Sequence, residues 1–320
     1  MEINEILDNE LKQKTYQVKY LQYHITNFIN YQYKETTREN YKHPLRKFNK
    51  YILNTPIVEL REDNINQTVK QYRNYLDENT NLKTSSIDNY ITILRVFLNQ
   101  HLNLETKRIK KLNTGNDTKP KYIELEDIKG LINTVPYITG NLEQIARDKA
   151  IICTLFGAGL RISELLNILL EDYITENGVY YLYIHSKGTA KEVKKPIVIP
   201  EETANHINEY LQQRQLHNRS CKYLFCSLND KQLTRQTANS IVKKIAKEYD
   251  KRNNKNISSR VSTHTFRHSL ARYLLVNKGL PISQVKDILR HSNIETTAKY
   301  LTNSQEEIQQ LRGNIFNLEV

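Results

Sequence analysis

Cysteine is scarce in this sequence, since a chain of 320 residues contains only Cys153, Cys221 and Cys226. Three unevenly spaced cysteines are too few for a disulfide framework, so we expect a protein of a reducing compartment. Cys221 and Cys226 lie near His217, but their spacing matches no common zinc-binding pattern. Ordinary packing is the expected role of these side chains, and we expect no metal.

Long apolar runs are also missing. The longest one, AIICTLFGAGL at residues 150–160, is too short to span a bilayer. The first residues, MEINEILDNELK, lack the basic and then apolar pattern of a secretory signal. These absences predict a soluble cytoplasmic protein with no membrane partner.

Acidic residues are outnumbered by basic ones. Lys and Arg total 47 against 35 Asp and Glu, which gives a formal net charge of +12 and a pI near 9.3. This balance favours a polyanionic partner, with nucleic acid first and an acidic membrane surface second. Because AT-rich genomes encode Lys-, Asn-, Ile- and Tyr-rich proteins of many functions, the charge raises the odds of nucleic-acid binding only modestly.

The first third of the chain has almost no glycine and shows helical periodicity. A leading helix around residues 10–30 and three further apolar stripes predict four amphipathic helices packed as a bundle with a basic exterior. A basic segment without apolar periodicity follows, and it predicts a linker over residues 112–120 between domains at 1–111 and 121–320. The three stripes are Tyr41, Leu45, Phe48 and Ile52; Ile65, Val69, Tyr72 and Leu76; and Ile87, Tyr90, Leu94, Phe97 and His101.

The remainder of the chain predicts a mixed α+β domain with a small antiparallel sheet. Residues 178–200 are rich in β-branched and aromatic side chains on both sides of SKGT, which is typical of a hairpin with Lys187 beside its tip. The fold as a whole is therefore expected to be mainly α. Helices are predicted at 142–156, 161–170, 201–214, 234–250, 264–277, 282–290 and 294–303.

The stretch FGAGLRISELL, residues 156–166, contains the first candidate for chemistry. Two glycines release the chain from one helix just before Arg161 begins the next, where backbone N–H groups favour anions. A surface salt bridge with Glu164, one turn further on, is the simpler explanation of Arg161 taken alone. Lysines at hairpin tips, such as Lys187, are also usually solvated.

The stretch THTFRHSLARYLL offers a more specific pair. Phe266, Leu270 and Leu274 repeat every four residues and predict a buried stripe, which leaves His264 and Arg267 one turn apart on another face. Such a pair can bracket one oxyanion. The adjacent His268 is expected to be a hydrogen-bonded core histidine.

The stretch LRHSNIETTAKYL, residues 289–301, places His291 before a helix break and Tyr300 in the following helix. One tyrosine among 21 carries no meaning alone. Because a break separates the two residues, both side chains could point into one cleft.

In order along the chain, these boxes resemble those of the tyrosine recombinases, the family of phage integrases and Xer-type recombinases. GLRISELL is similar to the family's first arginine box, HTFRHSLARYLL to its H-x-x-R box, and LRHSNIETTAKYL to its final His and Tyr box. TTRENYKHPLRKFNKYI resembles the helix that begins the family's core-binding domain. One departure is Arg290, because many relatives have glycine before the histidine.

The resemblance implies a role for each residue. Arg161 and Arg267 would bind the scissile phosphate, and Tyr300 would attack it to form a covalent 3′-phosphotyrosine. Lys187 would protonate the leaving 5′ oxygen, His264 would manage the tyrosine proton, and His291 would donate to the phosphate. Glu164 would orient its neighbours. Neither a cofactor nor a metal is implied.

The resemblance also implies the partners. Double-stranded DNA would be held mainly through its phosphates between the two domains, with the linker as a hinge. Four protomers would assemble on two DNA sites, each passing its tail, residues 305–320, to a neighbour, and would be monomers or weak oligomers off DNA. Open alternatives are a type IB topoisomerase or telomere resolvase using the same chemistry, and a non-catalytic helical DNA-binding protein.

Overall fold

The computed structural model describes residues 15–32, 35–107, 121–185, 193–291 and 293–298. The chain divides into two compact units, unit 1 at residues 1–117 and unit 2 at 118–320, and each is described by itself. The predicted linker, residues 112–120, lies outside the described residues. No helix in the described ranges is both long and apolar enough to cross a membrane.

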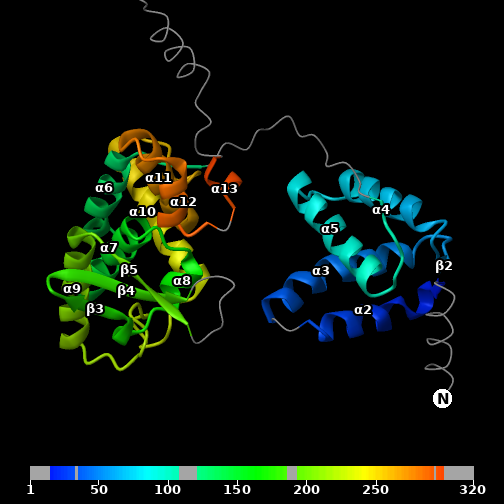
Figure 1. The fold of residues 1–320 in the computed structure, drawn as a ribbon, viewed down its shortest axis with the longest axis horizontal. Coiled ribbons are helices and arrows are strands. Elements are labelled where there is room, and N and C mark those ends of the chain that lie inside the picture. The colour runs from blue at the N-terminus through cyan, green and yellow to red at the C-terminus, as the bar shows by residue number, and fades with distance from the viewer. Residues whose placement is uncertain (1–14, 33–34, 108–120, 186–192, 292, 299–320) are drawn as a thin grey trace, which may run out of the picture. The chain divides into compact units, whose positions relative to one another are not determined.

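The described residues of unit 1 form four α-helices (blue to cyan in Figure 1). A two-residue strand, β1 (Tyr16–Gln17), pairs antiparallel with β2 (Glu59–Leu60) and is followed by a short 3₁₀ helix, η1 (Val18–Tyr20). The predicted leading helix, residues 10–30, is therefore wrong over 15–17, where Tyr16 is buried in an extended segment, and residues 10–14 lie outside the described residues. The helices are α2 (Leu21–Asn30), α3 (Glu35–Ile52), α4 (Ile65–Asn79) and α5 (Thr84–Gln100).

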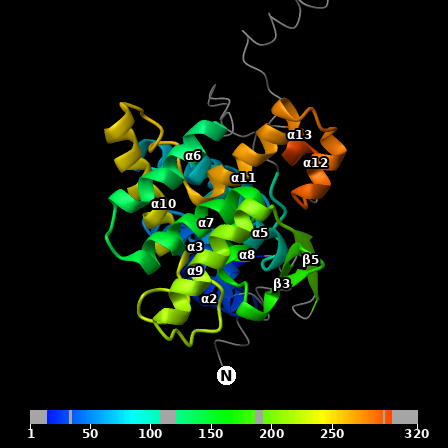
Figure 2. The ribbon, with the colours of Figure 1, turned by 90° about the vertical axis from the view of Figure 1, so that its left-hand side faces the viewer.

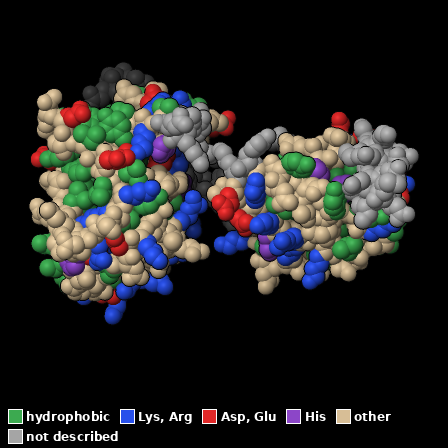
Figure 3. All heavy atoms as spheres, turned by 90° about the horizontal axis from the view of Figure 1, so that it is seen from below, with side chains coloured by type: hydrophobic (Ala, Val, Ile, Leu, Met, Phe, Trp, Pro, Cys, Tyr) green, Lys and Arg blue, Asp and Glu red, His purple; other side chains and the backbone are tan. Residues whose placement is uncertain are grey.

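The three predicted apolar stripes form the core of unit 1. Every stripe residue is buried except Tyr41, Tyr90 and His101, which are half-buried. Helical periodicity places these side chains on one face of each helix, so burying that face joins the helices. The polar faces remain outside, and Lys and Arg side chains are visible over the surface of both units (Figure 3).

The described residues of unit 2 are mainly helical and include a three-stranded sheet. Figure 2 shows α7 and α9 in the middle of the unit, the sheet at one edge, and α11, α12 and α13 close together. The helices are α6 (Leu125–Thr134), η2 (Val135–Tyr137), α7 (Leu142–Gly157), α8 (Ile162–Leu166), η3 (Leu170–Asp172), α9 (Glu201–Leu216), α10 (Arg235–Asn253), α11 (Thr263–Arg272), the π-helical η4 (Tyr273–Asn277), α12 (Ile282–Ile288) and α13 (Glu295–Ala298).

The sheet has the order β3-β4-β5, and both pairs are antiparallel. Strands β4 (Val179–His185) and β5 (Lys194–Val198) confirm the predicted hairpin, while β3 (Tyr173–Glu176) was not predicted. Asn177 and Gly178 connect β3 to β4 with φ values of 50° and 77°, as a tight two-residue turn requires. The expected mainly α fold with a small antiparallel sheet is confirmed.

Of the helices predicted in unit 2, one ends earlier than expected and another lies partly outside the described residues. The helix expected over 161–170 ends at Leu166, because the chain turns into an extended segment that bonds to residues 222–224 before η3. The helix expected over 294–303 is described only as α13, since residues 299–303 lie outside the described residues.

Candidate active site

Arg161 lies where the chain passes from α7 to α8. Gly159 has φ +57°, and a Cβ there would lie 2.7 Å from Leu270 Cδ2 and 2.9 Å from Leu289 Cδ2, so only glycine fits without rearrangement. The Arg161 backbone N–H donates to Glu164 Oε2 at 2.9 Å, and its Nη1 donates to Oε1 at 2.7 Å. The salt bridge considered from the sequence therefore exists and fixes the guanidinium at the start of α8.

Glu164 is a buried carboxylate that joins two arginines. Besides its two bonds from Arg161, it accepts a third from Arg290 Nη2 at 3.2 Å. Burial alone would raise the pKa of Glu164, but the hydrogen bonds and charges of Arg161 and Arg290 outweigh burial and lower it. Glu164 is thus a charged group at neutral pH, placed between two cations.

Arg267, on α11, connects the loop before α8 with the end of α12. The side chain is only 1% exposed, and its guanidinium donates to the carbonyl oxygens of Gly159 and Leu289. Those carbonyls precede Arg161 and His291 by two residues each. The buried arginine therefore fixes two of the predicted boxes relative to the third.

His264 and His268 lie one turn apart on α11, with ring centroids 4.4 Å apart and an edge-to-face arrangement. His264 remains exposed on α11, yet partial desolvation of its ring, followed by the charges of Arg267 and Arg161, lowers its pKa. Burial also lowers the pKa of His268 to about 4, with His264 and Arg267 adding to the effect. Both rings are therefore neutral at pH 7.

His291 lies three residues after Ile288, the last residue of α12, and is turned inward by the residue before it. Arg290 has φ +55°, which ends the helix in the left-handed conformation, and His291 N–H donates to Lys286 O at 2.9 Å. The Nδ1 atom lies 2.8 Å from the buried Thr297 Oγ1 on α13. Burial, aided by Arg267 and Arg161, lowers the pKa of His291 to about 4.

The structure thus brings four of the six predicted catalytic residues, Arg161, His264, Arg267 and His291, into one electrostatically coupled group, and the predicted supporting residue Glu164 bonds to Arg161. Lys187 lies outside the described residues, in the connection between β4 and β5. Tyr300 is also outside them, shortly after α13.

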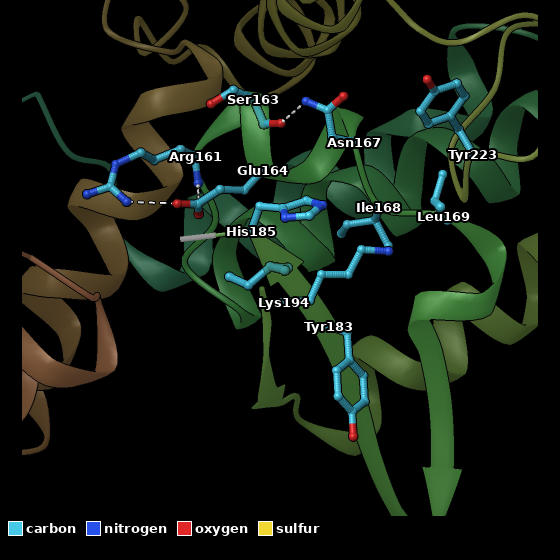
Figure 4. Close-up of a pocket in the computed structure, with 11 residues that line it drawn as sticks. Arg161, Ser163, Glu164, Asn167, Ile168, Leu169, Tyr183, His185, Lys194 and Tyr223 are labelled. Carbon is cyan, nitrogen blue, oxygen red and sulfur yellow. Dashed lines mark hydrogen bonds and ion pairs between the residues drawn. The ribbon is translucent and has the colours of Figure 1, made fainter. Parts of the chain in front are cut away.

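A cleft of about 540 Å³ adjoins Arg161. Figure 4 shows Arg161 bonded to Glu164, with His185 and Lys194 from the ends of β4 and β5 nearby. Lys194 Nζ lies 2.6 Å from Asp172 Oδ1, so this lysine is already paired with a carboxylate. The unpredicted strand β3 begins directly after Asp172 and completes this side of the unit.

Sequence reasoning missed three contributors to the site. Gly159 supplies the carbonyl for Arg267, Thr297 holds His291, and Arg290 reaches Glu164. The positive φ of Gly159 could have been suspected from its place after a helix. Nothing in the spacing indicated the other two contacts.

Metal binding has no candidate among the residues that the structure describes, because none of their His, Cys, Asp and Glu side chains gather in groups of three or more suited to an ion. Of the cysteines considered above, Cys226 is buried with Sγ 3.2 Å from the Tyr210 hydroxyl.

The fold is that of DNA-bound recombinases of known structure. XerH site-specific recombinase bound to its difH substrate aligns with a TM-score of 0.65 and 21% identity over 86% of this chain and 79% of that one. The Tn1549 transposon integrase in complex with transposon right end DNA aligns with a TM-score of 0.68 and 18% identity, over 94% of this chain and 99% of that one. At these identities the likeness concerns the fold alone.

Residues 121–307 match the phage integrase family, and the chain belongs to this family. Among curated relatives, tyrosine recombinase XerA of Pyrococcus furiosus is 28% identical over 216 residues, 67% of this chain and 68% of its own. Tyrosine recombinase XerD of Staphylococcus haemolyticus is 28% identical over 289 residues, which cover 87% of this chain and 91% of that protein. The resemblance noted from the three boxes is confirmed.

Proposed function

We propose that this protein is a site-specific DNA recombinase that cuts and rejoins strands through a covalent 3′-phosphotyrosine. One observation carries the proposal: the buried Arg267 joins the Arg161 loop to the His291 loop, so cations and neutral imidazoles from separate boxes face one region. Membership of the phage integrase family supports the same conclusion.

The reaction needs charge stabilisation at a phosphodiester. Attack by a tyrosine oxygen builds negative charge on the non-bridging oxygens, and guanidinium groups remain protonated while offering several N–H donors in a plane. Arg161, with 27% of its side chain exposed, is suited to direct contact with the phosphate. Arg267 is buried, where a positive charge is less screened by water and acts more strongly on the same phosphate.

The other roles follow from protonation states. A neutral His264 can accept the hydroxyl proton of Tyr300 while the tyrosine oxygen attacks the phosphorus. The bond from phosphorus to the 5′ oxygen breaks, and Lys187 donates a proton to that leaving oxygen. A neutral His291 whose Nδ1 accepts from the Thr297 hydroxyl keeps its proton on Nε2, from which it can donate to the phosphate. Glu164 orients Arg161. Rejoining reverses these steps.

The partner is double-stranded DNA, bound mainly through its phosphates by both units. The positive charge supports this, because Lys and Arg exceed Asp and Glu by 5 in residues 1–120 and by 7 in residues 121–320. We assign residues 1–111 to core binding and 121–320 to catalysis. A DNA substrate and the free thiols of all three cysteines fit action in the cytoplasm.

The active assembly is proposed to be four protomers on two DNA sites, with the tail, residues 305–320, packed on a neighbour. Deleting residues 312–320 should leave binding to a single half-site intact and reduce cooperative binding to paired half-sites. Gel shifts on one and two half-sites, with light scattering, measure this. Unchanged cooperativity would indicate that the tail folds on its own protomer.

The target sequence can be found together with the activity. The protein is incubated with a library of nicked duplexes that carry random sequence around the nick, so that the short cut strand diffuses away and the adduct persists. Denaturing gels isolate protein-linked DNA, and sequencing identifies the selected duplex. We expect an adduct that resists heating in detergent, is removed by protease and forms equally in EDTA.

Tyr300→Phe is the matched control, because it removes only the attacking oxygen. It should bind the selected duplex as the wild type does and form no adduct. An adduct with the Phe variant would assign the nucleophile elsewhere, and binding without any wild-type adduct would indicate a non-catalytic DNA-binding protein. Relaxation of supercoils without exchange between two sites would indicate a topoisomerase.

A further inference from the structure

Arg290 has no role in the reaction proposed above, yet its guanidinium lies inside the candidate active site. Nη2 is 3.2 Å from Glu164 Oε2 and 3.4 Å from Gly159 O, and Nη1 donates to Ile288 O at 3.1 Å. The side chain is 18% exposed. A cation in this position acts on the same groups that hold Arg161 and Arg267.

Two features make Arg290 energetically unfavourable at this position. Its φ of +55° is a conformation in which a Cβ crowds the following carbonyl and which glycine adopts freely. Its Nε is buried without a hydrogen-bond partner. Glycine at this position would have neither the backbone strain nor the unpaired Nε. What arginine offers in exchange is the set of contacts that its guanidinium makes with Glu164 and Gly159.

Those contacts converge on a shared carboxylate. Glu164 receives Arg161 through Oε1 and through the backbone N–H on Oε2, while Arg290 donates to Oε2. One negative charge therefore serves two cations, and the three groups together keep one positive charge. Without Arg290, the Glu164 carboxylate would neutralise Arg161 alone.

A second shared acceptor connects Arg290 to Arg267. The carbonyl oxygen of Gly159 accepts from Arg267 Nη1 and from Arg290 Nη2. The two arginines approach it from different elements, α11 and the end of α12, so both hold the loop that leads into Arg161. Without Arg290, Arg267 alone would hold this carbonyl, and the loop would keep one of its two guanidinium contacts.

We propose that Arg290 is a positioning residue of the recombinase site, which orients Arg161 toward the phosphate by sharing Glu164 with it and preserves net positive charge there. The inference rests on the proposed function and adds a residue to it. Because Arg290 acts through Arg161 on charge that develops during strand cleavage, its loss should slow cleavage much more than it weakens DNA binding.

The first test compares three substitutions on the selected duplex. Arg290→Ala and Arg290→Gly should each slow single-turnover adduct formation by about 10- to 100-fold, with DNA affinity nearly unchanged. Arg290→Gly also removes the backbone strain, so its melting temperature should equal or exceed that of the wild type. Arg290→Lys retains the charge and should recover part of the rate.

The matched control is Asn254→Gly, since Asn254 also has a positive φ, +50°, where it ends α10 in the left-handed conformation. It removes similar strain and should cleave at the wild-type rate. A stable Arg290→Gly protein that also cleaves at the wild-type rate would overturn the proposal. Slow cleavage accompanied by an equal loss of melting temperature in all three Arg290 variants would also overturn it, because the role would then be structural.

A double-mutant cycle tests whether Arg290 acts through Glu164. If it does, Arg290→Ala should slow cleavage by much less in a Glu164→Gln background than in the wild type. If the two substitutions instead slow cleavage by independent factors that multiply in the double variant, Arg290 does not act through Glu164 and the mechanism is overturned. Failure of the proposed function is recognised separately, since the wild type would then form no adduct on any duplex and the inference would fall with it.

Discussion

Arg161 and Arg267 carry the same charge in different surroundings. Arg161 is partly exposed and bonded to a carboxylate, whereas Arg267 is buried and donates to two carbonyl oxygens on separate loops. A lysine could replace the charge of either residue. It could not reproduce a planar guanidinium that reaches Gly159 and Leu289 at the same time.

Arg267→Lys is therefore expected to slow adduct formation by about 100-fold or more, with little change in DNA affinity. Single-turnover cleavage and gel shifts on the selected duplex measure the two effects. Arg235→Lys, at an exposed position on α10, is the control and should change neither. Equal losses of affinity and cleavage would make Arg267 a DNA-positioning contact.

The lowered pKa values of three histidines imply that the stability of the fold depends on pH. Burial lowers the pKa values of His24, His268 and His291 to about 4, whereas the unfolded chain protonates them near 6.5. The unfolded state therefore binds more protons between these values, so the free energy of unfolding should fall as pH drops from about 6.5 toward 4. Denaturant unfolding at several pH values measures it, and histidine ring resonances that titrate near 6.5 would contradict it.

At the scale of elements, periodic patterns predicted most of the fold. Ile65, Val69, Tyr72 and Leu76 recur at helical spacing, and all four are buried on α4. The hairpin of β4 and β5 was equally clear from its β-branched and aromatic residues. These signals succeed because the side chains that make the pattern are those that bury the element.

Other features depended on contacts that no spacing reveals. Strand β3 is short, and its turn at Asn177-Gly178 was a signal overlooked beside the longer hairpin. Residues 16–17 form a strand only because they pair with β2, which lies far along the chain. For the site, the residue types in the three boxes predicted Arg161, His264, Arg267 and His291, but the Arg290–Glu164 contact depends on how α12 ends against α8.

Gly159→Ala tests the join between α7 and α8. A Cβ at φ +57° is strained and crowds Leu270 and Leu289, so unit 2 should lose about 1–3 kcal/mol of stability. Gly178→Ala has the same sign of φ with open space around it, and it should cost less. Denaturant unfolding compares the two, and equal costs would contradict the crowding seen at Gly159.

At the scale of the whole molecule, each unit buries a core of its own. One apolar cluster is confined to residues 16–104 and two others lie within residues 123–289. Because none of these clusters of described residues includes side chains from both units, neither core needs the other unit to be complete. Both units also carry excess positive charge, so DNA binding can be divided between them.

A fragment of residues 121–320 should therefore fold by itself, with one cooperative unfolding transition, and bind the selected duplex more weakly than the full chain. Removing unit 1 should make the slope of log K for DNA binding against log salt concentration shallower, by about 0.9 for every phosphate that unit 1 binds. Gel shifts over a range of salt concentrations give both slopes, and adduct formation at saturating fragment shows whether the site still works. Equal slopes would mean that unit 1 binds no phosphates, whereas a fragment that unfolds without cooperativity would contradict the separate cores.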